Sequence, residues 1–536
     1  MTQPTLARTI RPAMLAAAVP LLAILSTAFV APVFAETTLR FVPQADLRNT
    51  DPIWTTAAIT QTHGFMIYDQ LFALDEEGRV QPQMIESHTV SEDGLAHTFT
   101  LREELRWHDG DPVTAADCVA SIRRWGERDT MGQKLMGITK GIDVLDDRTF
   151  RLVLSRPYGL VLESFAKFDS NALFIMKAEY AGTTDAYTQI KANVGSGPFR
   201  MAEDEWIPGN KVVYLKNEDY VPREEPASWF AGGKVVRVDR VEWLYIPDAA
   251  TAIAALQLGE VDYIEKPETD LIPLIARDPN IAVDPIPLVY QGWLQINHLH
   301  PPFDDPRARR ALLYMVHQED YVRAIIGDPQ YFRTYCGAIF LCGSPYESEA
   351  GADALRAHDP ERARALLAEA GYAGEPIVLM DPTDFPVLHG AALVTAQKLR
   401  EIGVNVNVQA MDWSTLTSRR AERKPPSEGG WHIFHTWWTS GSLTRPVSHP
   451  GVSGACEKAW FGWPCDEELQ RLSNAWALEP DPAERKRIAL ALQVRAYEVV
   501  PYVPYGQWRR PLAYRKSLRG LLITPTAVLW NVSKPE

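Results

Sequence analysis

The chain has 536 residues, 46% of them hydrophobic and 23% charged, and its formal net charge is −14. A chain of this length is too long for one compact domain, so we expect two or three lobes with ample core. The acidic balance argues against nucleic acid or an anionic membrane surface as the partner.

The first 35 residues have the pattern of a signal peptide. Arg8 and Arg11 precede an apolar stretch at 13–30, and residues 33–35 form a small-x-small cleavage site. We predict cleavage after Ala35 and export to the periplasm. An uncleaved anchor is the alternative, because the apolar stretch is long. No cysteine lies near this junction, which excludes a lipoprotein anchor.

Five cysteines suit an oxidising compartment. Cys336 and Cys342 are six residues apart, and Cys456 and Cys465 are nine apart. Neither spacing is the C-x-x-C of zinc or redox sites. We therefore predict two local disulfides, Cys336–Cys342 and Cys456–Cys465, with Cys118 left as a buried free thiol.

The N-terminal half predicts alternating strands and helices. Residues 38–42 have the pattern of a strand, and residues 55–74 that of an amphipathic helix. Residues 98–101 alternate as a strand, and Thr114 then caps a helix that runs through residue 125. Two further strands, separated by a turn, are expected within 141–154.

Several stretches resemble the family 5 extracellular solute-binding proteins, the peptide- and nickel-binding receptors of ABC importers. The signature is carried by residues 101–119, and residues 194–199 are similar to the family's Val-Gly-Thr-Gly-Pro turn. The glycines of that turn predict a tight crossing back into the first lobe. Residues 301–313 and 359–372 match family helices with Asp and Pro at their starts. Members of this family bind peptides, opines, metal chelates, haem and sugars, so the resemblance does not name a ligand.

The resemblance implies an α/β fold of the periplasmic-binding-protein-like type (type II, cluster C). Two main lobes joined by a hinge and one extra small α/β subdomain are expected. Lobe I would comprise 36–72, 193–297 and 505–536, the extra subdomain 73–192, and the third lobe 298–504. More than one crossover at a hinge is the architecture of closure around a ligand.

The motifs favour binding over catalysis, since neither G-x-S-x-G nor H-E-x-x-H is present. The expected function is a periplasmic receptor that captures a small peptide or peptide-like solute and delivers it to an ABC transporter membrane permease. We expect a monomer with no cofactor and no nucleic-acid partner. A nickel or other metal chelate is one alternative, although His432 and His435 would lie on opposite faces of a strand. A periplasmic hydrolase is another, prompted by the pair Asp381 and Asp384.

The resemblance also implies a ligand site. The loop after Asp51 lies beside the ligand in the family, so Trp54, Thr55 and Thr56 would face the cleft. Dipeptide receptors of the family hold the ligand ammonium with an Asp. The equivalent stretch of this chain, 436–442, has no Asp.

The region that supplies those receptors with an Arg for the ligand carboxylate is here 380–386, and it has no Arg. The residues that these two stretches do contain suit a solute with a cationic or amide-rich face. Asp384 would be its charge partner, Trp437 and Trp438 its stacking walls, and Thr439 and Ser440 its hydrogen-bond donors. The alternative is that Asp384 only caps a turn and that the two Trp alternate between core and cleft.

Overall fold

The computed structural model describes residues 36–535, so the predicted leader and its cleavage point lie outside the described residues. The strands form a seven-stranded, a six-stranded and a four-stranded sheet, together with the short pair β2 (Phe72–Leu74) and β3 (Val80–Pro82). The three larger sheets belong to three different lobes. Along residues 36–535, no helix is long and apolar enough to cross a membrane.

The seven-stranded sheet belongs to the first lobe and has the order β12-β19-β11-β1-β10-β9-β8. Its central strand β1 pairs in parallel with β10 and β11. A helix, α6 (Ala249–Leu258), ends at Gly259, whose φ of 79° is left-handed and therefore suits glycine. The strands are β1 (Thr38–Val42), β8 (Phe199–Met201), β9 (Lys211–Lys216), β10 (Arg240–Leu244), β11 (Tyr263–Ile264), β12 (Ile281–Pro285) and β19 (Pro511–Arg515).

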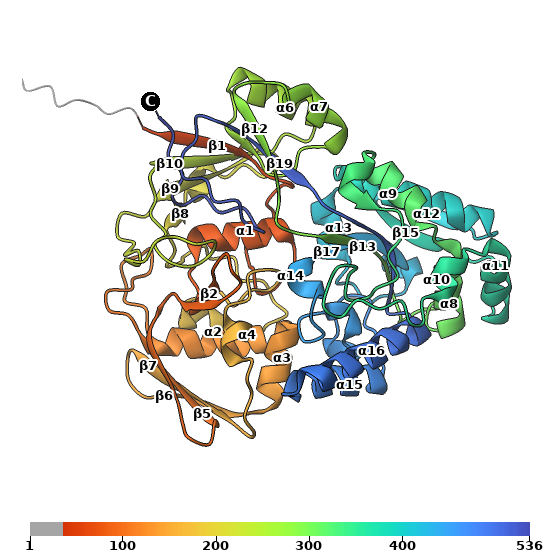
Figure 1. Ribbon diagram of the computed structural model, residues 1–536, viewed down its shortest axis with the longest axis horizontal. Helices are drawn as coiled ribbons and strands as arrows, with labels where there is room; N and C mark the ends of the chain where they lie inside the picture. Colours follow the sequence, from red (N-terminus) through yellow and green to blue (C-terminus); the bar gives the residue numbers. More distant parts are fainter. Residues whose placement is uncertain (1–35, 536) are drawn as a thin grey trace, which may run out of the picture. The chain divides into compact units, whose positions relative to one another are not determined.

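The four-stranded sheet forms the small lobe, with helices beside it (Figure 1). The predicted helix start at Thr114 is confirmed, because the Asp117 carboxylate accepts a hydrogen bond from the Thr114 backbone N–H at 2.8 Å. The sheet order is β4-β5-β7-β6. The elements are β4 (Ile85–Val90), β5 (Ala96–Leu101), α2 (Ala115–Arg128), α3 (Thr130–Gly137), β6 (Thr139–Val144), β7 (Thr149–Leu154), α4 (Val161–Phe165) and α5 (Ala178–Ala181).

The six-stranded sheet forms the C-terminal lobe, in the order β14-β18-β13-β17-β15-β16. Asp305 and Asp359 cap the two helices that the sequence predicted, each accepting from a backbone N–H. The strands are β13 (Tyr290–Ile296), β14 (Phe332–Arg333), β15 (Ile377–Pro382), β16 (Val406–Met411), β17 (Ile433–Thr439) and β18 (Tyr502–Trp508). The helices are α8 (Pro306–Met315), α9 (Gln318–Ile325), α10 (Asp353–Ala357), α11 (Pro360–Glu369), α12 (Pro386–Glu401), α13 (Trp413–Arg419), α14 (Ser440–Leu443), α15 (Glu467–Leu478) and α16 (Pro482–Val499).

The helix predicted over 55–74 is shorter and is not amphipathic. It is α1 (Ala58–Ile67), and all its residues from Ile59 onward are buried. The helix ends at Ile67, where the loop that contains Gly195 and Gly197 crosses it. A Cβ added to Gly195 would come within 1.6 Å of the Ile67 carbonyl oxygen, so only glycine fits there. The crossing predicted from these glycines is therefore present, and it limits the helix.

Two short connections join the first and C-terminal lobes. They are residues 286–289, between β12 and β13, and residues 509–510, between β18 and β19. The Ile286 N–H donates to the Arg510 carbonyl at 3.0 Å, so the two connections lie side by side. The boundaries predicted after 297 and before 505 have to move to these connections, because β13 and β18 pair within the C-terminal sheet.

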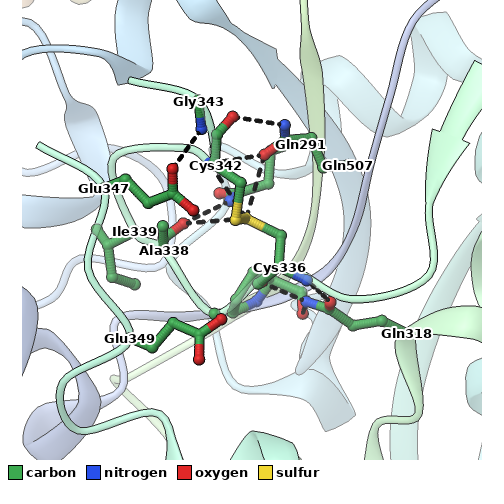
Figure 2. Close-up of a disulfide and its surroundings, with 12 residues drawn as sticks. Gln291, Gln318, Cys336, Ala338, Ile339, Cys342, Gly343, Glu347, Glu349 and Gln507 are labelled. Carbon is green, nitrogen blue, oxygen red and sulfur yellow. Dashed lines mark hydrogen bonds between the residues drawn. A yellow bond between two sulfur atoms is a disulfide. The ribbon is translucent and has the colours of Figure 1, made fainter. Parts of the chain in front are cut away.

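Both predicted cysteine pairs are disulfides in the structure, and Cys118 is a buried free thiol. The Cys336–Cys342 bond lies inside the C-terminal lobe, where the amides of Gln318 and Gln507 hold its backbone (Figure 2). The second disulfide closes a short surface loop in which Cys465 is exposed. The two bonds therefore sit in contrasting surroundings.

Candidate functional site

Two adjoining cavities lie between the C-terminal lobe on one side and the first and small lobes on the other. The first cavity measures about 60 Å³ and the second about 500 Å³, and both are lined by Thr56, Ser170 and Trp438. Their walls come from the start of α1, from residues 127–130 and 167–171 of the small lobe, and from α13, β17 and the 456–465 loop of the C-terminal lobe. Together these two cavities form the cleft between the lobes.

Direct contacts already cross this cleft. The indole N–H of Trp460 donates to the Thr56 hydroxyl at 3.2 Å, and Lys458 pairs with Glu127 at 3.1 Å. The Ser442 hydroxyl donates to the Asp169 carboxylate from the opposite side. The described arrangement is therefore a closed one, in which both sides of the cleft would touch the same solute.

Arg420, just after α13, is the buried cation of the first cavity. Its side chain is only 1% exposed in the cavity lining. The guanidinium donates to the hydroxyls of Thr55 at 3.3 Å and Thr56 at 3.2 Å, and its carbon lies 4.7 Å from the centre of the Phe461 ring. No carboxylate among residues 36–535 lies within 4.0 Å of it. Burial, reinforced by the positive charge of Arg128, lowers the pKa of Arg420.

Asp169 is an acidic group of the first cavity, and it contacts the short helix α14 that follows β17. It accepts from Ser442, and a Cβ on Gly441 would lie 3.1 Å from its carboxylate oxygen. Burial raises the pKa of Asp169, although the Lys167 ammonium at 3.8 Å opposes that shift. The small lobe thus brings to segment 436–442 the carboxylate that this segment lacks in its own sequence.

Lys266 and Glu265 form the other charged pair of this cavity, with 3.4 Å between them. The Lys266 ammonium lies 4.6 Å from the centre of the Trp437 ring and donates to Gln44 at 2.9 Å. Burial lowers the pKa of Lys266, and Glu265 opposes that shift. The protein's own lysine therefore occupies the cation–π face of Trp437, which had been expected to receive the ligand.

The structure brings together most of the residues predicted for the site. Thr56, Trp437, Trp438 and Thr439 line the first cavity, and Trp54 lines the second. Thr55 lines neither cavity; it is 1% exposed, and it positions Arg420.

Ser440 and Asp384 lie elsewhere. Ser440 lines a separate cavity, and its hydroxyl accepts from the Val289 N–H at 3.3 Å. Asp384 lines another cavity beside Tyr245, and its carboxylate accepts from the Trp413 N–H at 2.7 Å and from the Tyr245 hydroxyl at 3.2 Å. Because these contacts tie Asp384 to the start of α13, it does not line the cavity of Trp437 and Trp438.

The residues behind the two alternative functions are also dispersed. His432, just before β17, accepts from the Val378 N–H, whereas His435, within β17, contacts Thr395, so the two rings have different partners. Within residues 36–535, no group of three or more His, Cys, Asp or Glu side chains could hold a metal ion. Asp381 contacts His389 at 2.8 Å, whereas Asp384 accepts from the Trp413 N–H.

Sequence reasoning missed Arg420, Asp169 and Lys266. None belongs to a motif, and charged residues in a long acidic chain are ordinarily solvated. Arg420 follows Arg419 on a helix end, a pattern typical of surface charge. Only the packing of distant segments reveals that these three side chains are buried in one cleft.

Comparisons with known proteins agree with this architecture. The family model described as "Bacterial extracellular solute-binding proteins, family 5 Middle" matches residues 79–451. The chain is 42% identical over 487 residues to the "Probable peptide ABC transporter periplasmic-binding protein y4tO" of Sinorhizobium fredii, covering 90% of this chain and 91% of the relative. It is 26% identical over 483 residues to the glutathione-binding protein GsiB of Salmonella typhimurium, covering 89% and 90%.

Solved structures show the same fold. The agropinic acid complex of AgaA from A. tumefaciens R10 superposes with a TM-score of 0.76 at 24% identity, covering 93% of this chain and 99% of that one. DppA from Helicobacter pylori, in complex with the peptide STSA, gives a TM-score of 0.73 at 22% identity, covering 94% and 99%. From the family match, the 42% identical relative and the shared fold, the chain belongs to family 5 of the bacterial extracellular solute-binding proteins.

Proposed function

We propose that the protein is a periplasmic receptor for a small peptide or peptide-like solute, which it delivers to the membrane permease of an ABC importer. The solute lies in the two cavities between the lobes. Arg420 holds its carboxylate, and Asp169 holds its ammonium group. Support comes from the peptide-transporter and glutathione-binding relatives and from the closed cleft with opposite charges in its lining.

The unpaired Arg420 is the observation that carries this proposal. A buried charge without a partner costs several kcal/mol, so a protein that retains one needs a compensating anion. A guanidinium binds a carboxylate through two parallel hydrogen bonds, which fixes the direction of the ligand as well as its charge. The surrounding rings of Trp413, Trp460 and Phe461 exclude water and strengthen this contact.

The same geometry supports binding without turnover. Asp381 and Asp384, which prompted the hydrolase alternative, are each engaged by other groups. In the cleft itself, the acidic groups Asp169 and Glu265 each contact a lysine and are placed to hold charge.

The test is to purify the protein under mild conditions and to analyse the released solute by mass spectrometry. Calorimetry then follows with the identified compound and with synthetic di- and tripeptides. We expect micromolar or tighter binding of a peptide-like solute, with no hydrolysis on prolonged incubation. A protein that binds no peptide-like solute, or that cleaves the one it binds, would overturn the proposal.

A further inference from the structure

Two arginines of the lining, one from each side of the cleft, have a buried guanidinium nitrogen and no acidic partner in the described part of the chain, whereas the third arginine of the lining, Arg423, is exposed. Arg420 comes from the C-terminal lobe, and Arg128 is the last residue of α2 in the small lobe. Among residues 36–535, no carboxylate lies within 4.0 Å of either guanidinium, and the Nε of each is buried without a hydrogen-bond partner. Arg128 donates to the Trp54 carbonyl at 2.8 Å and lies 4.7 Å from the centre of the Tyr187 ring.

The lysines of the lining, in contrast, are matched. Lys167 contacts both Asp129 and Asp169, Lys266 contacts Glu265, and Lys458 contacts Glu127. The cationic side chains of the two cavities are Arg128, Lys167, Lys266, Arg420, Arg423 and Lys458, and the acidic ones are Glu127, Asp129, Asp169, Glu265 and Glu457. The lining therefore has one more cationic than acidic group. The cationic groups that are buried without an acidic partner are Arg128 and Arg420.

A simple peptide would leave this excess uncompensated. Its single carboxylate can pair with one guanidinium, and the other stays unpaired as the cleft closes. Arg128 and Arg420 also repel each other, since the charge of Arg128 adds to the lowering of the Arg420 pKa. Two anionic groups on one solute remove both costs at once.

We propose that the solute carries two carboxylates, one held by Arg420 and one by Arg128, together with one ammonium group held by Asp169. This rests on the proposed receptor function and narrows its substrate class to short peptides with one acidic side chain. Such a solute has one net negative charge, opposite to the excess of the lining. Because the two cavities share Thr56, Ser170 and Trp438, one short molecule can reach both arginines.

The experiment uses an equimolar library of synthetic tripeptides in which each Asp or Glu peptide has an Asn or Gln counterpart. The library is equilibrated with ligand-free protein, and the retained peptides are released and quantified by mass spectrometry. The variant Arg128→Gln is compared with Arg123→Gln, on the same helix. Arg123 is exposed and donates to the Ile142 carbonyl away from the cleft, so it is the matched control.

We expect wild type and Arg123→Gln to enrich the acidic peptides at least tenfold over their amide counterparts. Arg128→Gln should still retain tripeptides but should lose this preference. Retention without an acidic preference in wild type, or an unchanged preference in Arg128→Gln, would overturn the inference and leave the receptor function standing. If wild type retains no tripeptide at all, the receptor function for peptides fails and the inference fails with it. Circular dichroism verifies that each variant is folded.

Discussion

The indole N–H of Trp460 donates to the Thr56 hydroxyl at 3.2 Å, and this bond joins the C-terminal lobe to the start of α1. Thr56 also accepts from Arg420 at 3.2 Å, so one threonine connects an aromatic wall and the buried cation to the other side of the cleft. Because these contacts cross the cleft, separation of its two sides would break them. They therefore contribute to the difference in free energy between the open and closed states.

Trp460→Phe should weaken solute binding while leaving the fold intact. The ring stays over Arg420, but the hydrogen bond across the cleft is lost, which is worth about 1 kcal/mol or roughly a fivefold change in affinity. Calorimetry measures the affinity, and small-angle scattering measures the decrease in radius of gyration on binding. Unchanged affinity and an unchanged decrease in radius would show that this bond makes no contribution to closure.

The two disulfides should have different roles. The loop closed by Cys456 and Cys465 carries Trp460 and Phe461, which line the second cavity, whereas Cys336 and Cys342 are buried in the C-terminal lobe. Replacing Cys456 and Cys465 by Ser should lower solute affinity at least fivefold. Replacing Cys336 and Cys342 should leave affinity unchanged, and each of the two replacements should lower the free energy of unfolding by roughly 2–3 kcal/mol, the chain-entropy value for a short loop.

Urea unfolding and calorimetry on both double variants separate these effects. Equal losses of affinity in the two variants would contradict the assigned roles. In the wild type, thiol titration under denaturing conditions should find one free thiol, that of Cys118.

Solute binding should weaken in acid because of Asp169. Burial raises the pKa of this carboxyl, and a bound ammonium favours its charged form, so binding releases a proton. Affinity should therefore be full above the raised pKa and should fall as the pH is lowered through it, starting at a higher pH than an ordinary Asp would give. Calorimetry of wild type and Asp169→Asn between pH 4 and 8 tests this. An identical pH profile in the variant would show that Asp169 does not hold the ammonium group.

Stability should also depend on pH through buried neutral histidines. Burial lowers the pKa of His435 to about 3 and that of His432 to about 4, from the ordinary 6.5. Below pH 6.5 the unfolded chain binds protons that the folded chain does not, so stability is present at neutral pH and falls as the pH decreases. Each histidine contributes at most about 1.4 kcal/mol per pH unit in that window. Urea unfolding at pH 7 and pH 5 should show a smaller decrease for His435→Gln than for wild type, and an equal decrease would contradict the assignment.

Much of the architecture could be predicted from sequence because its signals are local. The cap at Thr114, the helix starts at Asp305 and Asp359 and the glycine crossing at Gly195 each depend on a few adjacent residues. The helix limit at Ile67 could not be predicted, since it is set by a crossing segment more than a hundred residues away in the chain.

The site was predicted only in part for the same reason. The resemblance placed Thr56, Trp437 and Trp438 in the cleft lining, where the structure has them. Asp384, which was expected in the site, lies outside the cleft lining, whereas Arg420, which was not expected there, lines it. The first is held by Trp413 and Tyr245, and the second is covered by the rings of Trp413, Trp460 and Phe461. Burial of a lone charge arises from tertiary packing, which leaves no pattern in the sequence.

The most direct test of this account is to measure the effect of Arg420→Met on stability and on affinity together. Removing an unpaired buried charge should leave the free energy of unfolding of the ligand-free protein unchanged or raise it by about 1–2 kcal/mol. The same change should weaken solute binding at least tenfold, about 1.4 kcal/mol. Arg419→Met is the matched control, because Arg419 only donates to the carbonyls of Gly429 and Gly430. The predicted result is weakened affinity without a loss of stability in Arg420→Met, with affinity retained in Arg419→Met. Unchanged affinity, or a loss of several kcal/mol in stability, would contradict a ligand-binding role for Arg420.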